Sequence, residues 1–585
     1  MQQTSLSKHI WESRYRVAAE HDREADITDT WARVANAVAE VEADQTAWQR
    51  SFYRILEDFR FLPGGRILAG AGTENRVTLF NCFVMGTVVD SIEGIFNAFK
   101  EAAITMEQGG GIGFDFSTLR PSGTAALRSG MTASGPLSFM FVLDSICDAM
   151  LASSARRGAI MMTLRCDHPD IEQFINVKRR RDALRNFNLS VLITDAFMQA
   201  VADDAEWQLH FESPSATDQI DNTNTIIRAL PAREIWRKIN VAAHDCAEPG
   251  VLFVDRINSE NNLAYCEVIS ATNPCGEVPL PPYGACCLGS INLTAFVRDP
   301  FTQSSSVDES DLRKTVAIAV RFLDNVIDIS HYPLPSQAKQ ARATRRIGLG
   351  ITGLADMLVM LGLHYDSAAA RRKAAQLMRI IRDVAYASSI DLAKEKGRFE
   401  LFDAQKYLRA PFVSRLPNRL QDEIASNGMR NSHLLAIAPT GTVSLLANNI
   451  SSGIEPIYSL EAERAVRDRE LKMPRFLVRD YAYSQWRENG HASNAIPDTF
   501  VTTDALPGDA HLRMQAEIQP FVDNAISKTV NLPDDASVDD VAAMYQAAYT
   551  MGVKGCTVYR TGSRRGQVLR DRDKPHCCDI DREAD

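Results

Sequence analysis

The chain has 585 residues, of which 45% are hydrophobic and 24% charged, a composition typical of globular proteins that excludes extensive disorder. Its net charge of −10 argues against nonspecific binding to DNA or RNA, but it is compatible with a local pocket for a small anion. The first residues lack the pattern of a secretory signal, and no apolar run is long enough to span a bilayer, so we expect a cytoplasmic protein.

The beginning of the chain is expected to be helical, and the middle to mix helices with strands. Residues 6–60 carry apolar side chains at helical spacing, and the turn sequence Leu-Pro-Gly-Gly-Arg at 62–66 ends this region. Downstream, strand-like runs such as 188–193 alternate with helix-like runs such as 311–326, which is typical of an α/β fold. The charged stretch 564–585 is expected to be a flexible tail.

The cysteines do not indicate a disulfide scaffold, because there are 11 of them, an odd number, in a large chain without an export signal. Cys147 and Cys166 lie in ordinary or apolar stretches, and we interpret both as core residues. The chemistry is therefore expected at other cysteines.

The most informative segment is Asn-Pro-Cys-Gly-Glu at 273–277, in which Cys275 and Glu277 stand two residues apart. Proline fixes φ and glycine lets a ligand approach the backbone, so this pattern predicts a tight loop with both side chains facing one ligand. A zinc site would need a shorter cysteine spacing, and a cysteine protease would need a recognisable histidine partner, so both are weaker hypotheses. Three further cysteines belong to the candidate site: Cys82, Cys286 and Cys287.

Residues 273–277, followed by Cys-x-Leu-Gly-Ser-Ile-Asn-Leu at 286–293, resemble the active-site signature of the large subunit of ribonucleotide reductases. The offset of 11 residues from Cys275 to Cys286 matches the family's second active-site cysteine, whereas Cys287 stands where relatives commonly have asparagine. Which of the two is the redox partner stays open. More segments agree in the same order: Leu62-Pro-Gly-Gly-Arg-Ile-Leu, Gly109-Gly-Gly-Ile-Gly, Arg156-Arg-Gly-Ala, His168-Pro-Asp-Ile, Ala438-Pro-Thr-Gly-Thr and Gly453-Ile-Glu-Pro.

The resemblance covers about residues 10–570 and implies the fold of this family. That fold is a ten-stranded α/β barrel of two five-stranded halves arranged antiparallel, with a catalytic finger loop inside. We expect an N-terminal helical region at 1–75, the barrel at 76–563 and a flexible redox tail at 564–585.

The resemblance also implies a role for each residue of the candidate site. Cys275 becomes a thiyl radical that takes the 3′ hydrogen of the ribose, Glu277 is the general base for the 3′-hydroxyl, and Asn273 orients the substrate. Cys82 and Cys286 supply the reducing equivalents and end as a disulfide. Cys577 and Cys578 of the tail would reduce it by thiol–disulfide exchange, with a thioredoxin- or glutaredoxin-like protein as the final reductant. A solvated tail without function is the competing interpretation for this last pair.

Two nucleotide sites follow from the same resemblance. The loop before a helix at 439–444 resembles the substrate phosphate loop, and its residues Pro439, Thr440, Gly441 and Thr442 are joined as substrate contacts by Gly64, Asn81 and Gly111. A deoxynucleoside triphosphate effector is expected at Asp90, Ser91 and Arg120, with Arg156 and Arg157 in the loop that relays its signal. Because such a site usually lies between subunits, a homodimer is expected. Solvated surface charge is the competing interpretation for the two loop arginines.

The radical source is expected to be adenosylcobalamin. The segment Lys-Gly-Cys-Thr-Val-Tyr-Arg at 554–560 holds one tyrosine, Tyr559, without the adjacent tyrosine that relays a radical from a second subunit, and it resembles the cobalamin-dependent branch. In that branch the cofactor carries the hard chemistry and the protein positions it. No Asp-x-His-x-x-Gly motif occurs, so we expect no histidine ligand to cobalt and no other metal site.

A dinucleotide-binding pattern points to a different function. Gly348-Leu-Gly-Ile-Thr-Gly matches this pattern, but no strand is predicted before it, and we interpret its glycines as sites of tight helix packing. A nicotinamide-dependent oxidoreductase is therefore the weaker hypothesis. A nucleotide-binding regulator without catalysis is another rival, but the presence of Cys82, Cys275, Cys286 and Glu277 argues against it. A reductase that needs a small subunit and a reductase for triphosphates stay open. For the substrate we favour ribonucleoside diphosphates.

Overall fold

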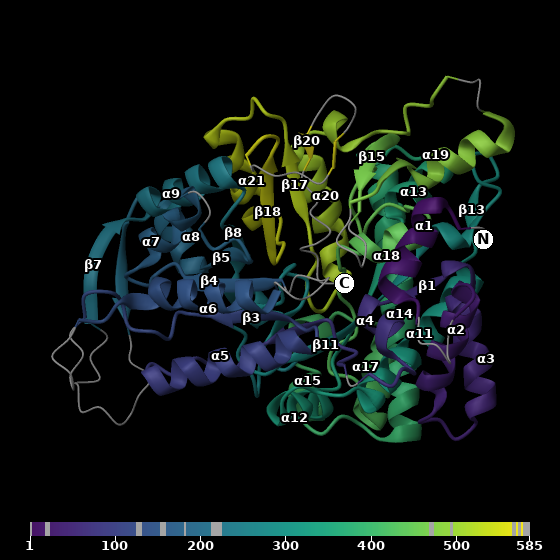
Figure 1. Ribbon diagram of the computed structural model, residues 1–585, viewed down its shortest axis with the longest axis horizontal. Coiled ribbons are helices and arrows are strands. Elements are labelled where there is room, and N and C mark those ends of the chain that lie inside the picture. The colour runs from purple at the N-terminus through teal and green to yellow at the C-terminus, as the bar shows by residue number, and fades with distance from the viewer. Residues whose placement is uncertain are drawn as a thin grey trace.

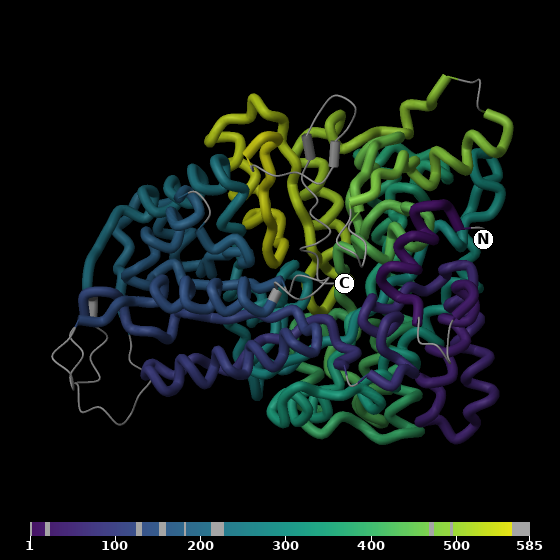
Figure 2. Tube along the Cα trace, viewed as in Figure 1, coloured from purple at the N-terminus to yellow at the C-terminus, as the bar shows by residue number. Residues whose placement is uncertain are grey.

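The computed structural model describes residues 3–17, 24–75, 77–124, 132–151, 159–180, 183–211, 225–466, 473–491 and 495–563, together with 569–570 and 575–576. Its N-terminal part is helical, as predicted, with α1 (Ser5–Ile10), α2 (Ile27–Ala39) and α3 (Gln45–Leu56). Asp26 caps α2 by accepting a hydrogen bond from the backbone N–H of Thr28. α2 and α3 pack against the later helix α11 (Glu309–Ile329), and Figures 1 and 2 show these purple helices at the right of the molecule.

An aromatic contact joins the N-terminal helices to the rest of the molecule. Phe52 of α3 meets Phe322 of α11 (Glu309–Ile329) edge to face, with 5.3 Å between the ring centroids. Phe61 of β1 (Phe61–Pro63) contacts Phe322 in the same way. Since β1 also pairs antiparallel with a barrel strand, these buried rings fix the helical region against the barrel.

One half of the central barrel consists of parallel strands. Their near-continuous apolar sequences are typical of strands buried on both faces. In spatial order they are β2 (Cys82–Val84), β3 (Gly111–Asp115), β4 (Ile160–Arg165), β5 (Phe187–Ile193) and β8 (Gly250–Phe253). The expected strand at 188–193 is therefore confirmed as β5. Helices on the outside of this half are α5 (Ile92–Glu107), α6 (Gly135–Leu151), α7 (Ile171–Asn176), α8 (Asp195–Ala202), α9 (Ala232–Cys246) and α10 (Val254–Ser259).

The other half is also parallel and runs opposite to the first. Its members are β11 (Ala285–Asn292), β14 (Ile347–Thr352), the bridged segment 434–437, β17 (Thr529–Leu532) and β18 (Gly555–Arg560). Antiparallel pairs join the halves at both junctions, β11 with β2 and β18 with β8. The predicted barrel of two antiparallel five-stranded halves is thereby confirmed.

The second half carries its own helices. They are α11, which contains the helix expected at 311–326, followed by α12 (Pro335–Thr344), α13 (Leu354–Met360), α14 (Ala368–Lys396), α17 (Asn418–Asn427), α18 (Gly441–Leu446), α19 (Tyr481–Trp486), α20 (Gly508–Ile518) and α21 (Val538–Thr550). α11 and α14 pack side by side, and α20 and α21 flank β17 and β18 (Figure 1).

A hairpin enters the barrel and forms the expected finger loop. β9 (Ala271–Thr272) and β10 (Pro279–Leu280) pair antiparallel, and residues 273–278 form its tip. On β3, Gly113 lets the finger approach, because a Cβ there would lie 1.9 Å from the carbonyl oxygen of Thr272. The side chain of Thr163 on β4 donates a hydrogen bond to the carbonyl of Ser270 at 3.1 Å, so the strand wall holds the base of the finger.

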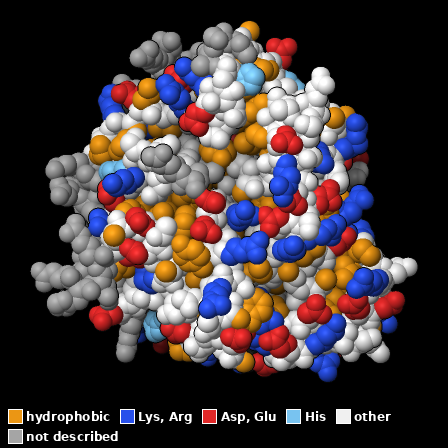
Figure 3. Space-filling view, turned by 90° about the vertical axis from the view of Figure 1, so that its right-hand side faces the viewer, with side chains coloured by type: hydrophobic (Ala, Val, Ile, Leu, Met, Phe, Trp, Pro, Cys, Tyr) orange, Lys and Arg blue, Asp and Glu red, His pale blue; other side chains and the backbone are white. Residues whose placement is uncertain are grey.

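A smaller sheet lies beside the barrel. β15 (Glu461–Ala465) pairs with β16 (Arg475–Arg479) on one side and with β19 (Leu569–Arg570) on the other, and β20 (Pro575–His576) pairs with β19. Acidic and basic side chains are interspersed on the face shown in Figure 3. In the described part of the chain, no helix is both long and apolar enough to cross a membrane.

Candidate active site

Two of the predicted thiols face each other across neighbouring strands. Cys82 of β2 and Cys286 of β11 are register partners in an antiparallel pair, and both are fully buried. Directly opposed residues in such a pair have Cα atoms about 4.5–5.5 Å apart, a separation that a disulfide can bridge. Both cysteines are free thiols in this structure.

The register also separates Cys286 from Cys287. Successive side chains of a strand point to opposite faces of the sheet, so only one of the two adjacent cysteines can lie on the same face as Cys82 of the neighbouring β2. Cys286 packs in the small cluster that contains Cys82, whereas Cys287 packs in the main hydrophobic core. Burial raises the pKa of the Cys287 thiol, and the charge of Asp324 adds to this effect.

The tip of the finger brings the predicted polar residues to this thiol pair. The side-chain amide of Asn273 donates a hydrogen bond to Sγ of Cys82 at 3.2 Å, and its oxygen accepts one from the backbone N–H of Val278 at 2.9 Å. Asn273 is therefore held from both ends. Burial raises the pKa of Cys82 well above its usual value, and the neighbouring Glu277, Cys275 and Cys286 raise it further.

The side chains of Cys275 and Glu277, both at the finger tip, lie in different surroundings. Gly276 between them has φ of 84°, a left-handed conformation that favours glycine. Glu277 is fully buried, whereas Cys275 is only half-buried and lines a cavity. The carbonyl of Glu277 accepts a hydrogen bond from the N–H of Ala525 at 2.9 Å, and the side chain of Asn188 donates one to the carbonyl of Pro274 at 3.1 Å.

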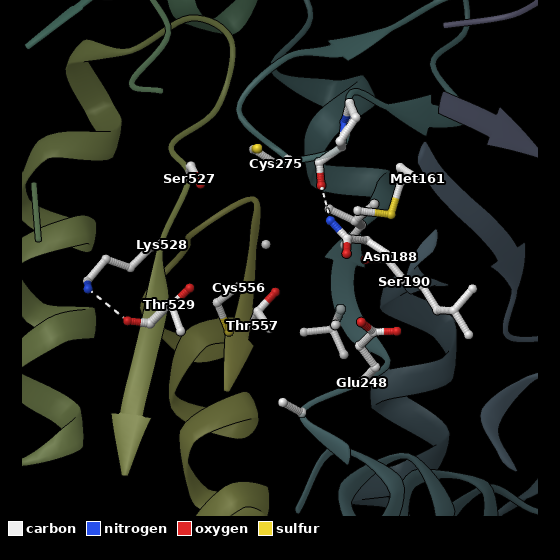
Figure 4. Close-up of a pocket in the computed structure, with 18 of the residues that line it drawn as sticks. Met161, Asn188, Ser190, Glu248, Cys275, Ser527, Lys528, Thr529, Cys556 and Thr557 are labelled. Carbon is white, nitrogen blue, oxygen red and sulfur yellow. Dashed lines mark hydrogen bonds between the residues drawn. The ribbon is translucent and has the colours of Figure 1, made fainter. Parts of the chain in front are cut away.

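The cavity beside Cys275 has a volume of about 200 Å³ and lies between the two barrel halves (Figure 4). Figure 4 shows the thiol of Cys275 at its upper end, with Ser527 and Thr557 on one wall and Asn188 on the other. Donors and acceptors line it together with apolar groups such as Met161. A ligand with polar edges, such as a nucleoside, matches this mixed lining.

A second, smaller cavity is lined by three of the predicted substrate residues. Gly64, Asn81 and Thr440 line it together with residues 288–290 of β11. Among the described residues, no hydrogen-bond partner reaches the buried Oδ1 of Asn81, so this oxygen can accept a hydrogen bond from a ligand. A Cβ on Gly64 would lie 2.8 Å from that oxygen, so glycine keeps the space open. Gly111 of β3 donates its N–H to the carbonyl of Asn81 at 2.8 Å, and it is the register partner of Cys82 on β2.

The candidate phosphate loop runs into α18. Thr440 has a left-handed conformation with φ of 55°, and its hydroxyl hydrogen-bonds Thr352 at 2.9 Å and Ser444 at 3.0 Å. The N–H of Gly453 also donates to Thr440 Oγ1 at 2.9 Å. Pro439 lines the Cys275 cavity and Thr440 lines the smaller one, so the loop borders both cavities. Gly441 and Thr442 form the first turn of α18.

Comparison with known families agrees with this geometry. Residues 80–559 match the family model described as "Ribonucleotide reductase, barrel domain", and residues 1–76 match "Ribonucleotide reductase, all-alpha domain". The chain belongs to the ribonucleotide reductase family. The domain limits expected from the sequence stay a prediction, although these matched ranges run close to them.

Curated reductases of this family resemble most of the chain. A "Vitamin B12-dependent ribonucleoside-diphosphate reductase" of Mycobacterium tuberculosis is 39% identical over 96% of this chain and 80% of its own length. One of Thermoplasma acidophilum with the same name is 37% identical over 88% of this chain and 66% of its own length. A "Vitamin B12-dependent ribonucleotide reductase" of Streptomyces coelicolor is 30% identical over 86% of this chain and 58% of its own length.

The predicted effector residues lie together at the start of α5. Nε of Arg120 donates a hydrogen bond to Asp90 at 2.7 Å, and this ion pair is largely buried. Ser91 caps α5 by accepting a hydrogen bond from the N–H of Gly94 at 3.0 Å. Arg156, Arg157, Cys577 and Cys578 lie outside the described residues.

Sequence reasoning misread one motif of this reductase and missed several residues around the thiols. Gly348 and Gly350 were expected to be sites of helix packing, but they lie on β14 in the barrel. A Cβ on Gly350 would lie 2.3 Å from the carbonyl oxygen of Ala436, so close strand packing requires glycine there. Asn188, Lys528 and Thr557 of the cavity were missed because they come singly from distant strands, without a local motif that could have indicated them.

Proposed function

We propose that this reductase converts ribonucleoside diphosphates into 2′-deoxyribonucleotides for DNA synthesis, with adenosylcobalamin as its radical source. The observation that carries the proposal is that Cys82 and Cys286 are register partners on neighbouring strands, and that Cys275, which acts on the pKa of Cys82, lines the larger cavity. The names of the relatives from Mycobacterium tuberculosis and Thermoplasma acidophilum support both vitamin B12 dependence and the diphosphate substrate.

The cavity beside Cys275 fits the nucleoside part of such a cofactor. Its lining offers side-chain donors and acceptors from both barrel halves, chiefly Asn188, Ser190, Ser527 and Thr557. When bound, adenosylcobalamin supplies a carbon-centred radical that oxidises a neighbouring thiol. Cys275 is the thiol that lines this cavity, and a ligand that fills the cavity would cover this half-buried thiol against water and stray hydrogen donors.

The chain's own residues then divide the reaction among them. Cys275 takes the 3′ hydrogen of the ribose, while Glu277 accepts the proton of the 3′-hydroxyl. Asn273 orients the substrate hydroxyls, an assignment supported by its position beside Cys82. Cys82 and Cys286 give up two electrons and two protons: one proton leaves with the 2′-hydroxyl as water, and the other proton and the two electrons become the new hydrogen at C2′. The two thiols end as a disulfide, and Cys275 returns the 3′ hydrogen to the ribose. Gly64, Asn81, Gly111 and residues 439–442 hold the nucleotide, which is supported for Gly64, Asn81 and Thr440 by their shared cavity.

The proposed partners follow from the family and from the surface. A thioredoxin- or glutaredoxin-like protein restores the thiols through Cys577 and Cys578. A deoxynucleoside triphosphate binds at Asp90, Ser91 and Arg120. A second copy of the chain covers the apolar face of α5 and α6, where the exposed side chains are Val89, Ile92, Phe96, Phe141 and Val142.

The decisive experiment measures deoxynucleotide formation by the full chain with dithiothreitol as reductant. We expect product from a ribonucleoside diphosphate only when adenosylcobalamin is present, and none from Cys275→Ser. The matched control is Cys147→Ala, which removes a buried thiol of α6 outside the candidate site and keeps activity. Turnover by Cys275→Ser, or turnover without the cobalamin, would overturn the proposal. A faster reaction with triphosphates would correct the substrate.

A further inference from the structure

An arginine stands in line with the two proposed redox thiols. Ile347 of β14 pairs in parallel with Cys287 of β11, so the preceding Arg346 lies level with Cys286. Cys286 is in turn the register partner of Cys82 on β2. Side chains at the same level of adjacent strands point to the same face of a sheet. Arg346, Cys286 and Cys82 therefore form a row across three neighbouring strands.

Arg346 is buried and held in a fixed orientation. Only 1% of its side chain is exposed, and its guanidinium forms an ion pair with Glu267, which is 6% exposed. Nε of Arg346 also donates a hydrogen bond to Nδ1 of His433 at 3.1 Å. Burial and the charge of Arg346 lower the pKa of His433 well below its usual value, so this imidazole is neutral and can accept the bond. The cation beside Cys286 is thus permanent and immobile.

The two thiols differ in the charges that act on them, although Glu277 raises the pKa of both. Burial raises the pKa of Cys286, but among the charges that act on this thiol Arg346 has the largest effect and lowers the pKa, against Glu277 and Asp523, which raise it. Around Cys82, the charges of Glu277, Cys275 and Cys286 all raise the pKa, and only the hydrogen bond from Asn273 lowers it. Arg346 therefore favours a thiolate at Cys286, whereas the charges that act on Cys82 disfavour a thiolate there.

We propose that Arg346 is a positioning residue for reduction of the Cys82–Cys286 disulfide, and that it directs attack to Cys82 by stabilising Cys286 as the leaving thiolate. This inference rests on the proposed function, which supplies the disulfide. The incoming thiolate forms a bond to Sγ of Cys82 while the Cys82–Cys286 bond breaks and its electron pair goes to Sγ of Cys286. The second thiol of the reductant then displaces Cys82, and both cysteines take up protons.

Exchange is faster when the leaving thiol has a lower pKa, so this arrangement speeds the step that precedes every new turnover. The other ionisable groups that face the row are Glu277 and Asp523 beside Cys286, and Lys554 and His433 beside Arg346. Burial lowers the pKa of Lys554 to about 8, so its charge changes within the useful pH range. Rates are therefore compared between variants at each of several pH values.

The test follows reduction of the oxidised enzyme by dithiothreitol. The disulfide is formed by one turnover without reductant and is mapped by mass spectrometry to Cys82 and Cys286. We expect Arg346→Gln to slow its reduction about tenfold at pH 7, and Arg346→Lys, which keeps the charge, to stay within about threefold of the wild type. Glu267→Gln removes the counter-charge and keeps the cation, so it is expected to speed the same step.

A second readout distinguishes this role from a merely structural one. With glutathione as a monothiol, the mixed disulfide of the wild type should form on Cys82, whereas Arg346→Gln should give both adducts. Equal rates for folded Arg346→Gln and the wild type, or slower reduction of Glu267→Gln, would overturn the inference. If Arg346→Gln does not fold, Glu267→Gln and the adduct site in the wild type still decide. If one turnover leaves no Cys82–Cys286 disulfide, the proposed function itself is wrong.

Discussion

A Cβ on Gly348 would lie 3.0 Å from Sγ of Cys286, because β14 passes directly beside this thiol. The same atom would lie 2.6 Å from Cδ2 of Leu288. Glycine at this position therefore leaves the thiol room to rotate toward Cys82. The glycine pattern that resembles a dinucleotide-binding motif is explained by this contact inside the barrel.

Gly348→Ala should impair disulfide formation more than it impairs folding. Overpacking of this kind costs about 1–3 kcal/mol of unfolding free energy, and here the crowding falls on a reacting atom. We expect multiple-turnover activity to drop at least tenfold, measured as deoxynucleotide formed with dithiothreitol. Gly508→Ala is the matched control. Its Cβ would lie 2.7 Å from Cδ2 of Leu532, and this crowding does not involve the thiols. Equal losses in both variants would contradict the prediction.

Cys286→Ala and Cys287→Ala should differ sharply, although the residues are adjacent. Only Cys286 faces Cys82, so its removal should stop sustained turnover with dithiothreitol, because no internal disulfide can form. Cys287→Ala removes one sulfur from the main core, costs about 1 kcal/mol of unfolding free energy and should leave sustained turnover within about twofold. Mass spectrometry after a single turnover provides the check. A disulfide that involves Cys287 would refute the assignment.

The side chain of Asn81 should lower the unfolding free energy of the protein and strengthen its binding of substrate. Its buried Oδ1 has no partner here, and such an oxygen costs about 1–3 kcal/mol. Asn81→Leu should therefore keep or raise the unfolding free energy, measured with urea, while KM for the ribonucleotide rises at least tenfold. Asn240→Leu on α9 is the matched control, because its Oδ1 is also buried without a partner. Its KM should not change; a changed KM there, or an unchanged one for Asn81→Leu, would count against the role of Asn81.

The sequence was sufficient to predict the barrel and the residues of the finger tip, because their motifs are local and occur in a fixed order. It could not decide between Cys286 and Cys287, since that choice depends on the register of β11 against β2. The role of Arg346 was also beyond reach, because it arises from a row across three strands that are distant in sequence. The glycines of β14 were misread because spacing alone does not tell a strand from a helix contact.

The apolar start of α5 should be a contact between two copies of the chain. Ile92 is 65% exposed and Phe96 is 50% exposed, beside the exposed apolar residues of α6. Replacing both with glutamate should shift the protein to monomers in sedimentation velocity, because two buried charges per copy oppose association. The effector should then lose its influence on base selection, since Asp90 and Ser91 begin the same helix. Val268→Glu, which changes a residue that is 70% exposed elsewhere, should leave the assembly intact.

A buried carboxyl pair should make folding stability fall as pH rises. Asp356 on α13 and Asp480, the cap of α19, are both buried, and each carboxyl shifts the pKa of the other. Burial raises the pKa of Asp480 well above its usual value and that of Asp356 to about 6. Since the folded state binds these protons more tightly than the unfolded state, their contribution is complete below about pH 4 and is lost as pH rises through 6.

Asp480→Asn tests this directly, because asparagine can still cap α19 but leaves Asp356 without a second negative charge beside it. Between pH 4.5 and pH 8, the pair should lower the urea-derived unfolding free energy of the wild type by about 3 kcal/mol. In the variant this decrease should be smaller by about 1 kcal/mol or more. Asp356 also accepts a hydrogen bond from the N–H of Ser451 at 2.7 Å, and Ser451 in turn contacts Thr352 beside the phosphate loop. Parallel pH profiles for the two proteins would show that the pair does not share a proton.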